Sequence, residues 1–302
     1  MTDSPLKAAI TSLAREASIE TSTRNIAEVA SYSDFLRRGT DVYITWLPGA
    51  TRQHLVSMAT RLRAAGFNPV PHIAVRELAG EAYAAELLVR LAGEAAVDQV
   101  LVIAGDTPVP VGPYACSSDF IATGLLQRHG VRRIGLAGYP EGNPRLPVGN
   151  ADEVLAQKLS LAVQSGLDAW IVSQFCFDGE TILAWLDRLR LRGVNAQVRV
   201  GLTGIASLKT LLAYAMRCGV VASTRALRTN AISLTRLVTK IGPDQPLAAL
   251  AAGLTDPDLL ARVRLHFYPF GGVVATARWL NAVKEGRFVL AADGSGFVTA
   301  EV

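Results

Sequence analysis

Eight short apolar runs, each followed by a segment of helical periodicity, restrict the fold of this chain more than any other feature. Most of the runs lack the polar alternation of a half-exposed strand, so they are typical of parallel strands covered on both faces. The runs lie at 17–20, 42–46, 68–73, 99–104, 132–138, 169–174, 197–203 and 263–268. The periodicity predicts helices at 24–37, 51–65, 76–94, 115–129, 151–165, 178–192, 205–217 and 272–284. Eight strand–helix units over about 270 residues fit a (β/α)8 barrel, whereas a doubly wound sheet normally has five or six strands.

We therefore predict a TIM barrel, an α/β fold, formed by residues 1–302 as a single domain with extra helices before the eighth strand. The interval 204–261 is too long for one helix and holds three helical patterns. Thr51 and Asp178 stand where the N-caps of two helices are expected. Residues 1–18 predict a short helix, and Gly and Asp in the centre of the last 17 residues favour a terminal hairpin.

Composition excludes several classes of protein. Half of the 302 residues are apolar and 19% are charged, so the chain can bury enough surface to fold. Three cysteines without metal-ligand spacing argue against a disulfide scaffold and favour a reducing cytoplasm. The formal net charge of +4 comes from scattered basic residues, so we expect no nucleic-acid partner. Neither a secretory signal nor an apolar run of about 20 residues is present, and we expect a cytoplasmic protein without a membrane segment.

In a barrel of this kind the reactive groups belong at the carboxyl ends of the strands. The sequence shows no spacing of carboxylates or histidines for a metal site there, no G-x-S-x-G, and no Cys/His pairing. It also lacks a P-loop and a G-x-G-x-x-G. The polar groups expected at these ends are Glu20, Thr45, His72, Gly105 with Asp106, Tyr139 with Glu141, Gln174, Thr203 and Tyr268.

These strand ends carry a resemblance. The series Ile-Glu at 19–20, Val-Tyr-Ile-Thr at 42–45, Pro-His at 71–72, Ala-Gly-Asp at 104–106, Tyr-Pro-Glu at 139–141 and Ser-Gln-Phe-Cys-Phe-Asp at 173–178 resembles the methylenetetrahydrofolate reductase family. The resemblance extends over roughly residues 17–285, and SQFCFD is its most specific part. The Gly-Asp after the fourth strand is the next most specific part, single pieces such as Pro-His are weak, and the occurrence of the motifs in register on successive strands makes the case.

The resemblance implies a flavin oxidoreductase of one-carbon metabolism. Such an enzyme interconverts 5,10-methylenetetrahydrofolate and 5-methyltetrahydrofolate by hydride transfer through N5 of FAD. It makes Glu20 the catalytic general acid, a task that suits a carboxyl of raised pKa. Glu20, Asp106, Gln174 and Tyr268 would bind the folate substrate. FAD would contact Thr45, His72, Ala104, Gly105, Asp106, Tyr114, Ala115, Tyr139, Asn143 and Lys158.

The chain also departs from the family pattern. Ala104 replaces an arginine before Gly-Asp, and Asn143-Pro144-Arg145 replaces His-Pro-Glu. Loss of the arginine at position 104 weakens binding of the FAD pyrophosphate unless Arg145 or Lys158 supplies another positive charge. Leu208 stands near the place of an aromatic residue that stacks nicotinamide in relatives, and HFYPFGG ends the eighth strand where relatives have Asn-Arg. These two departures leave open whether the protein uses NAD(P)H and how it binds the glutamate tail of folate. The physiological direction, which includes oxidation of the 5-methyl form, and assembly as a homo-oligomer are also open.

Plainer interpretations compete with these roles. Glu20 could cap the following turn, His72 could be a core histidine, and Asp106 could start a turn before Thr-Pro. One alternative function is a folate-binding barrel that has lost redox catalysis or works only with a partner protein. Another is an aldolase or lyase, which needs a Schiff-base lysine or metal ligands that the strand ends do not show.

Overall fold

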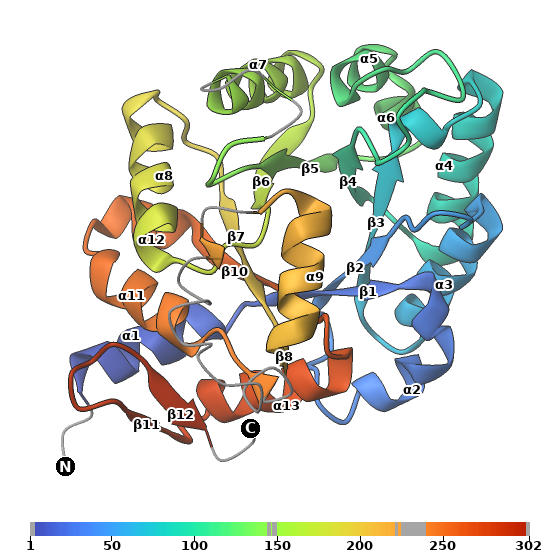
Figure 1. Cartoon of the computed structure of the whole chain (residues 1–302). Coiled ribbons are helices and arrows are strands. Elements are labelled where there is room, and N and C mark those ends of the chain that lie inside the picture. Colours follow the sequence, from blue (N-terminus) through green and yellow to red (C-terminus); the bar gives the residue numbers. More distant parts are fainter. Residues whose placement is uncertain (1–3, 144–145, 147–149, 221–222, 225–239, 300–302) are drawn as a thin grey trace. The chain divides into compact units, whose positions relative to one another are not determined.

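The computed structural model of the chain describes residues 4–143, 146, 150–220, 223–224 and 240–299. Within these residues, eight strands close into a barrel with parallel pairing, in the order β1–β10–β7–β6–β5–β4–β3–β2 (Figure 1). Each strand neighbours the next one along the chain, which confirms the predicted (β/α)8 barrel. The barrel strands are β1 (Ser18–Ser22), β2 (Asp41–Thr45), β3 (Asn68–Ala74), β4 (Gln99–Ile103), β5 (Arg133–Gly138), β6 (Asp168–Ser173), β7 (Val198–Thr203) and β10 (Val263–Tyr268).

Helices follow the strands as expected. Two of the longer ones, α3 and α8, begin at the predicted caps: the Thr51 side chain accepts from the His54 amide, and Asp178 accepts from the Thr181 amide. The helices are α1 (Pro5–Ala14), α2 (Val29–Tyr32), α3 (Arg52–Ala64), α4 (Glu81–Ala95), α5 (Ser117–Ala122), α6 (Leu125–Arg128), α7 (Ala151–Gln164), α8 (Gly179–Leu191), α9 (Leu208–Cys218), α11 (Asp244–Gly253), α12 (Pro257–Arg262) and α13 (Val273–Lys284), with 3-10 turns η1 (Thr23–Glu28) and η2 (Val75–Glu77).

Three predicted helices are shorter or broken. The helix expected at 24–37 is η1 followed by the single turn α2, because Asn25 is non-helical (φ −92°, ψ 16°). The helix expected at 115–129 divides into α5 and α6 at Gly124, whose φ is +71°. The helix expected at 76–94 starts only at Glu81, after η2.

The insertion before the eighth strand contains α9, α11 and α12, together with the short antiparallel pair β8 (Ala206–Ser207) and β9 (Lys240–Ile241). Part of it, residues 225–239, where the sequence predicts a further helix, lies outside the described residues. The terminal hairpin is confirmed as β11 (Phe288–Leu290) paired with β12 (Phe297–Thr299).

The chain packs as two compact units, described separately below. The first comprises Met1–Ile19, Tyr139–Asp152 and Ser173–Val302, and the second comprises Glu20–Gly138 and Glu153–Val172. The single domain over 1–302 stays a prediction.

Each unit has an apolar core. In the second unit Tyr43, Val70, Leu101, Trp170 and Val172 pack together, and the Trp170 indole donates to the Tyr43 hydroxyl at 2.9 Å. In the first unit the cluster is Phe175, Phe177, Ala206, Leu211, Ala215 and Val220. The aromatic residues 175 and 177 are therefore packing residues, as buried aromatic side chains usually are.

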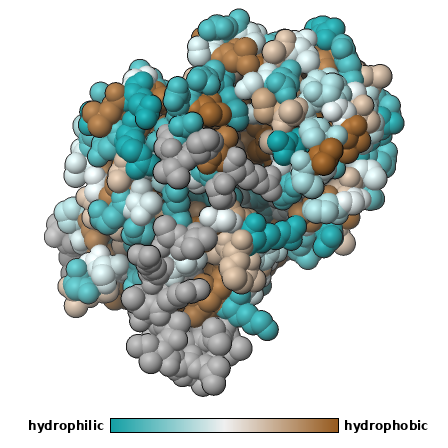
Figure 2. Space-filling view, turned by 45° about the horizontal axis from the view of Figure 1, so that its top comes forward, coloured by the Kyte–Doolittle hydropathy of each residue, from teal (hydrophilic) through white to brown (hydrophobic). Residues whose placement is uncertain are grey.

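On the face drawn in Figure 2, hydrophilic residues are interspersed with small groups of hydrophobic ones, an ordinary pattern for a protein surface. No helix in the described part of the chain is long and apolar enough to cross a membrane.

Candidate functional site

A buried acid and a buried histidine lie together in the second unit. Glu20 projects from β1 and His72 from β3, and the two residues are 6% and 7% exposed. Glu20 Oε1 is 3.8 Å from His72 Nε2, and the His72 ring meets Tyr43 edge-on at 6.1 Å between ring centroids. His72 Nε2 is buried, and it neither donates nor accepts a hydrogen bond with the described residues. The two residues that the sequence predicted as acid and cofactor contact are thus brought together.

Burial decides the charge of this pair. Removal from water raises the pKa of Glu20 to about 8 and lowers the pKa of His72 to about 3. Their separation of 3.8 Å is longer than a hydrogen bond, so neither group compensates the other's charge by a close contact. At pH 7 the pair is a neutral carboxylic acid beside a neutral imidazole. Such a carboxyl can donate a proton, which is the role of a general acid.

The loop after β4 has a glycine at its sharpest point. Gly105 has φ +92°, and a Cβ there would lie 3.1 Å from Ala74 Cβ, so this position favours glycine on two grounds. Ala104 O accepts from the Arg76 amide at 3.0 Å, which holds the start of the loop to the end of β3. Asp106 is exposed, and the Thr45 hydroxyl at the end of β2 donates to Thr21 O at 3.0 Å.

The end of the same loop holds two further predicted residues, Tyr114 and Ala115, and a third, Lys158, lies on α7. Tyr114 is buried and packs edge-on against Phe120 at 5.2 Å, so its ring anchors the loop. Ala115 is exposed, and Lys158 from α7 is half-buried. Burial lowers the pKa of Lys158, and a charge on Cys116, the neighbour of Ala115, opposes that shift.

Arg76 is a residue of this region that sequence reasoning missed. Its Nε donates to Ala115 O at 2.7 Å and its Nη1 donates to Thr107 O at 3.4 Å, so its side chain spans the loop. The only sequence signal is an arginine placed directly after a barrel strand.

In the first unit, Gln174 and Tyr268 lie together. The Tyr268 hydroxyl donates to Ser173 O at 2.8 Å, beside Gln174. Gln174 Oε1 accepts from the Phe175 amide at 3.1 Å, which leaves its Nε2 without a hydrogen bond to the described residues. A Cβ at Gly201 would lie 2.8 Å from the Tyr268 ring, so this glycine makes room for the tyrosine.

The loop after β5 also belongs to the first unit. Tyr139 O accepts from the Gly142 amide at 3.0 Å, and Asn143 O accepts from the Leu146 amide at 3.0 Å, so both are parts of turns. Glu141 accepts hydrogen bonds from Ser223 Oγ and, at 3.6 Å, from Cys176 Sγ. Arg145, which the sequence offered as a replacement cation, lies outside the described residues.

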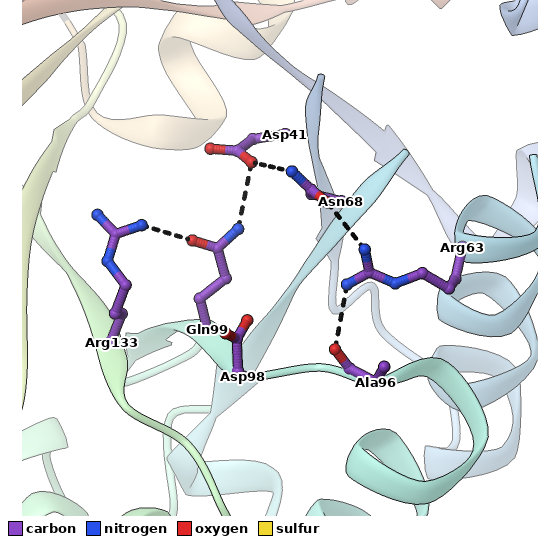
Figure 3. A pocket seen from close by; sticks show the side chains of 7 residues that line it. All are labelled: Asp41, Arg63, Asn68, Ala96, Asp98, Gln99 and Arg133. Carbon is purple, nitrogen blue, oxygen red and sulfur yellow. Dashed lines mark hydrogen bonds between the residues drawn. The ribbon is translucent and has the colours of Figure 1, made fainter. Parts of the chain in front are cut away.

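A polar cavity of about 410 Å³ in the second unit lies at the amino ends of the strands, away from their carboxyl ends (Figure 3). Its lining includes the first residues of β2, β3, β4 and β5, and their side chains form hydrogen bonds with one another. Asp41 Oδ1 accepts from Asn68 and Gln99, while Arg63 donates to Asn68 and Arg133 donates to Gln99. Barrel catalysis uses the carboxyl ends, and polar networks at the amino ends stabilise the fold. The lining residues are Asp41, Arg63, Asn68, Ala96, Asp98, Gln99 and Arg133.

Comparison with known proteins supports the resemblance. A sequence model of the family described as methylenetetrahydrofolate reductase matches residues 19–227, more than half of the chain. Methylenetetrahydrofolate reductase 1 of Schizosaccharomyces pombe is 36% identical over 87 residues, which are 29% of this chain and 14% of the relative. The 5,10-methylenetetrahydrofolate reductase of Pectobacterium carotovorum subsp. carotovorum is 27% identical over 123 residues, 40% of this chain and 39% of the relative. The matches therefore span well under half the length of either relative.

Proposed function

Since the chain belongs to the methylenetetrahydrofolate reductase family, we propose that it interconverts 5,10-methylenetetrahydrofolate and 5-methyltetrahydrofolate with FAD as cofactor. The observation that carries this proposal is the buried Glu20, whose pKa of about 8 keeps its carboxyl protonated at neutral pH. At pH 7 a group of that pKa is protonated in a ratio of about ten to one.

Glu20 is proposed to hold the proton that moves when the methylene bridge opens. The neutral His72 beside it favours this role, because a cationic histidine at 3.8 Å would stabilise the carboxylate and lower its pKa. For the reverse direction the same carboxyl, once ionised, accepts the proton back. One buried group can thus act as acid and as base.

The residues of the second unit fit a flavin. A buried His72 nitrogen without a hydrogen bond, the glycine turn at Gly105 and the half-buried cation Lys158 offer a polar atom, a close backbone approach and a positive charge. Thr45, Ala104, Asp106 and Ala115 complete the proposed contacts there, while Tyr114 positions the loop from within. When bound, FAD supplies the hydride acceptor and donor that no side chain provides.

The residues of the first unit are proposed to recognise the folate. Gln174 Nε2 is available to donate to an acceptor on the pterin, and Gln174 Oε1 is held by the Phe175 amide, which fixes the amide's orientation. Tyr268 is fixed by its bond to Ser173 O and presents an aromatic wall. Tyr139 and Asn143 remain proposed contacts of the cofactor.

The test is an anaerobic flavin spectrum of the purified protein. We expect FAD to bind at micromolar concentration and 5-methyltetrahydrofolate to bleach it, with NADH and NADPH added separately to identify the electron donor. Glu20→Gln should retain bound FAD and lose folate turnover, while Glu180→Gln, an exposed glutamate in the first turn of α8, should retain both.

The outcomes separate the candidates. No FAD binding at micromolar concentration contradicts the proposal. Folate binding without flavin reduction selects the alternative, a folate-binding barrel that lacks redox activity or needs a partner protein. If Glu20→Gln loses bound FAD to the same extent as it loses folate turnover, Glu20 has a structural role.

A further inference from the structure

Arg76 lies where two strand ends and a loop meet in the second unit. It belongs to η2, directly after β3, and its amide donates to Ala104 O at the end of β4. Its own carbonyl accepts from the Val111 amide at 2.8 Å, so the backbone of Arg76 is tied to both ends of the segment 104–111. The backbone of Arg76, from which the side chain projects, is therefore held next to the carboxyl ends of β3 and β4.

The charge of Arg76 has no acidic partner in the described part of the chain. The guanidinium donates only to the carbonyl oxygens of Ala115 and Thr107, and its Nη2 makes no hydrogen bond with the described residues. By contrast, Arg52, Arg90 and Arg128 pair with carboxylates. A partly buried cation satisfied by carbonyls alone still attracts an anion, and an arginine fork matches phosphate oxygens.

The nearby carboxylates are engaged elsewhere. Glu77 accepts the Thr107 hydroxyl, and Asp119 accepts the amides of Ala115 and Cys116 at 2.8 and 2.9 Å. Neither forms an ion pair with Arg76 among the described residues.

A second cation approaches the same end of the loop. Lys158 is half-buried on α7 and interacts electrostatically with Cys116, while Arg76 bonds Ala115, the preceding residue. Lys158 forms no ion pair with a carboxylate among the residues described. Two positive side chains from different elements thus converge on residues 115–116.

We propose that Arg76, with Lys158, binds the pyrophosphate of the dinucleotide cofactor and supplies the cation that is absent at Ala104. This inference rests on the proposed function for the identity of the ligand, and on the geometry for the diphosphate chemistry. Arg76 offers a directional fork and Lys158 a point charge, a pair that suits two adjacent phosphates.

The test compares ligands with and without the diphosphate. Arg76→Gln keeps an amide donor that can reach toward Ala115 O and removes the charge, so it separates charge from anchoring of the loop. We expect it to weaken FAD binding by about 10- to 100-fold, measured by quenching of flavin fluorescence, because a hydrogen bond to a charged group is lost. Binding of riboflavin, which lacks phosphate, should stay within about twofold, and the salt dependence of FAD binding should become shallower. Arg52→Gln is the control.

Inorganic pyrophosphate provides a second binding test that does not depend on the flavin. The wild-type protein should bind it, and Arg76→Gln should lose that binding in calorimetry. Equal weakening of FAD and riboflavin, or unchanged FAD affinity, overturns the inference while leaving the proposed function intact. Pyrophosphate binding without FAD binding rejects the function and retains the anion site, and absence of both rejects both.

Discussion

The stability of the protein should depend on pH through the neutral pair Glu20 and His72. The folded-state pKa of Glu20 is raised from 4.5 to about 8, so its contribution to stability is complete below pH 4.5 and is lost as pH rises toward 8. The folded-state pKa of His72 is lowered from 6.5 to about 3, so its contribution is complete above pH 6.5 and is lost as pH falls toward 3. Between pH 4.5 and 6.5 the two slopes oppose each other and nearly cancel.

The magnitude above pH 6.5 comes from Glu20 alone. Each pH unit between the unfolded and folded pKa values changes the free energy of unfolding by about 1.4 kcal/mol. The interval from 6.5 to about 8 therefore lowers stability by about 2 kcal/mol. Since native proteins are stable by about 5–15 kcal/mol, this loss is measurable.

The assay is urea unfolding followed by circular dichroism at pH steps from 5 to 8.5, with the free energy extrapolated to water. Glu20→Gln should lose this decline above pH 6.5, whereas Glu180→Gln should follow the wild type. His72→Gln should retain the decline and let it begin near pH 4.5, because the opposing slope is gone.

His72→Gln also decides between a neutral pair and an ion pair. In an ion pair the decline above pH 6.5 would come from a histidine of raised pKa and would vanish in this variant. A flat His72→Gln profile between pH 6.5 and 8 would refute the neutral pair and, with it, the general acid held protonated by burial.

Two further substitutions test the packing inside each unit separately. Tyr43→Phe should lower the free energy of unfolding by about 1–3 kcal/mol, because it leaves the buried Trp170 indole N–H without its acceptor; chemical denaturation measures this, and an unchanged stability would mean that the bond contributes nothing. Gly201→Ala should destabilise by about 1–3 kcal/mol through overpacking, since the new Cβ would meet Ser173 O and the Tyr268 ring. It should also weaken folate binding more than FAD binding in parallel titrations, and equal effects on both would contradict the assignment of Tyr268 to the folate.

The sequence predicted the order of strands and most helices because periodicity and caps are local properties. Thr51 and Asp178 cap helices through side chains that reach only three residues along the chain. The breaks at Asn25 and Gly124 were missed because each is a single-residue conformational choice inside a pattern that still reads as helical. Propensity is a weak guide at such points.

For the candidate site, the sequence identified residue types but could not supply their environment. Glu20 and His72 were placed at strand ends by position alone, while their burial and mutual distance depend on the tertiary fold. Arg76 was overlooked because an arginine after a strand looks like a surface residue. Only its bonds to two carbonyls, without a carboxylate, distinguish it.

The proposed proton donor and the proposed phosphate cations place opposite demands on their surroundings. An acid that stays protonated at pH 7 must be kept away from positive charge, because a cation within about 4–6 Å lowers a carboxyl pKa by about 1–3 units. Burial raises the pKa of Glu20, and His72 beside it is neutral. Arg76 lies in η2, where its side chain donates to carbonyl oxygens of Ala115 and Thr107, and Lys158 lies on α7. In the proposed arrangement the cation for the phosphates is Arg76 rather than a residue at position 104, and Glu20 stays protonated beside a neutral His72.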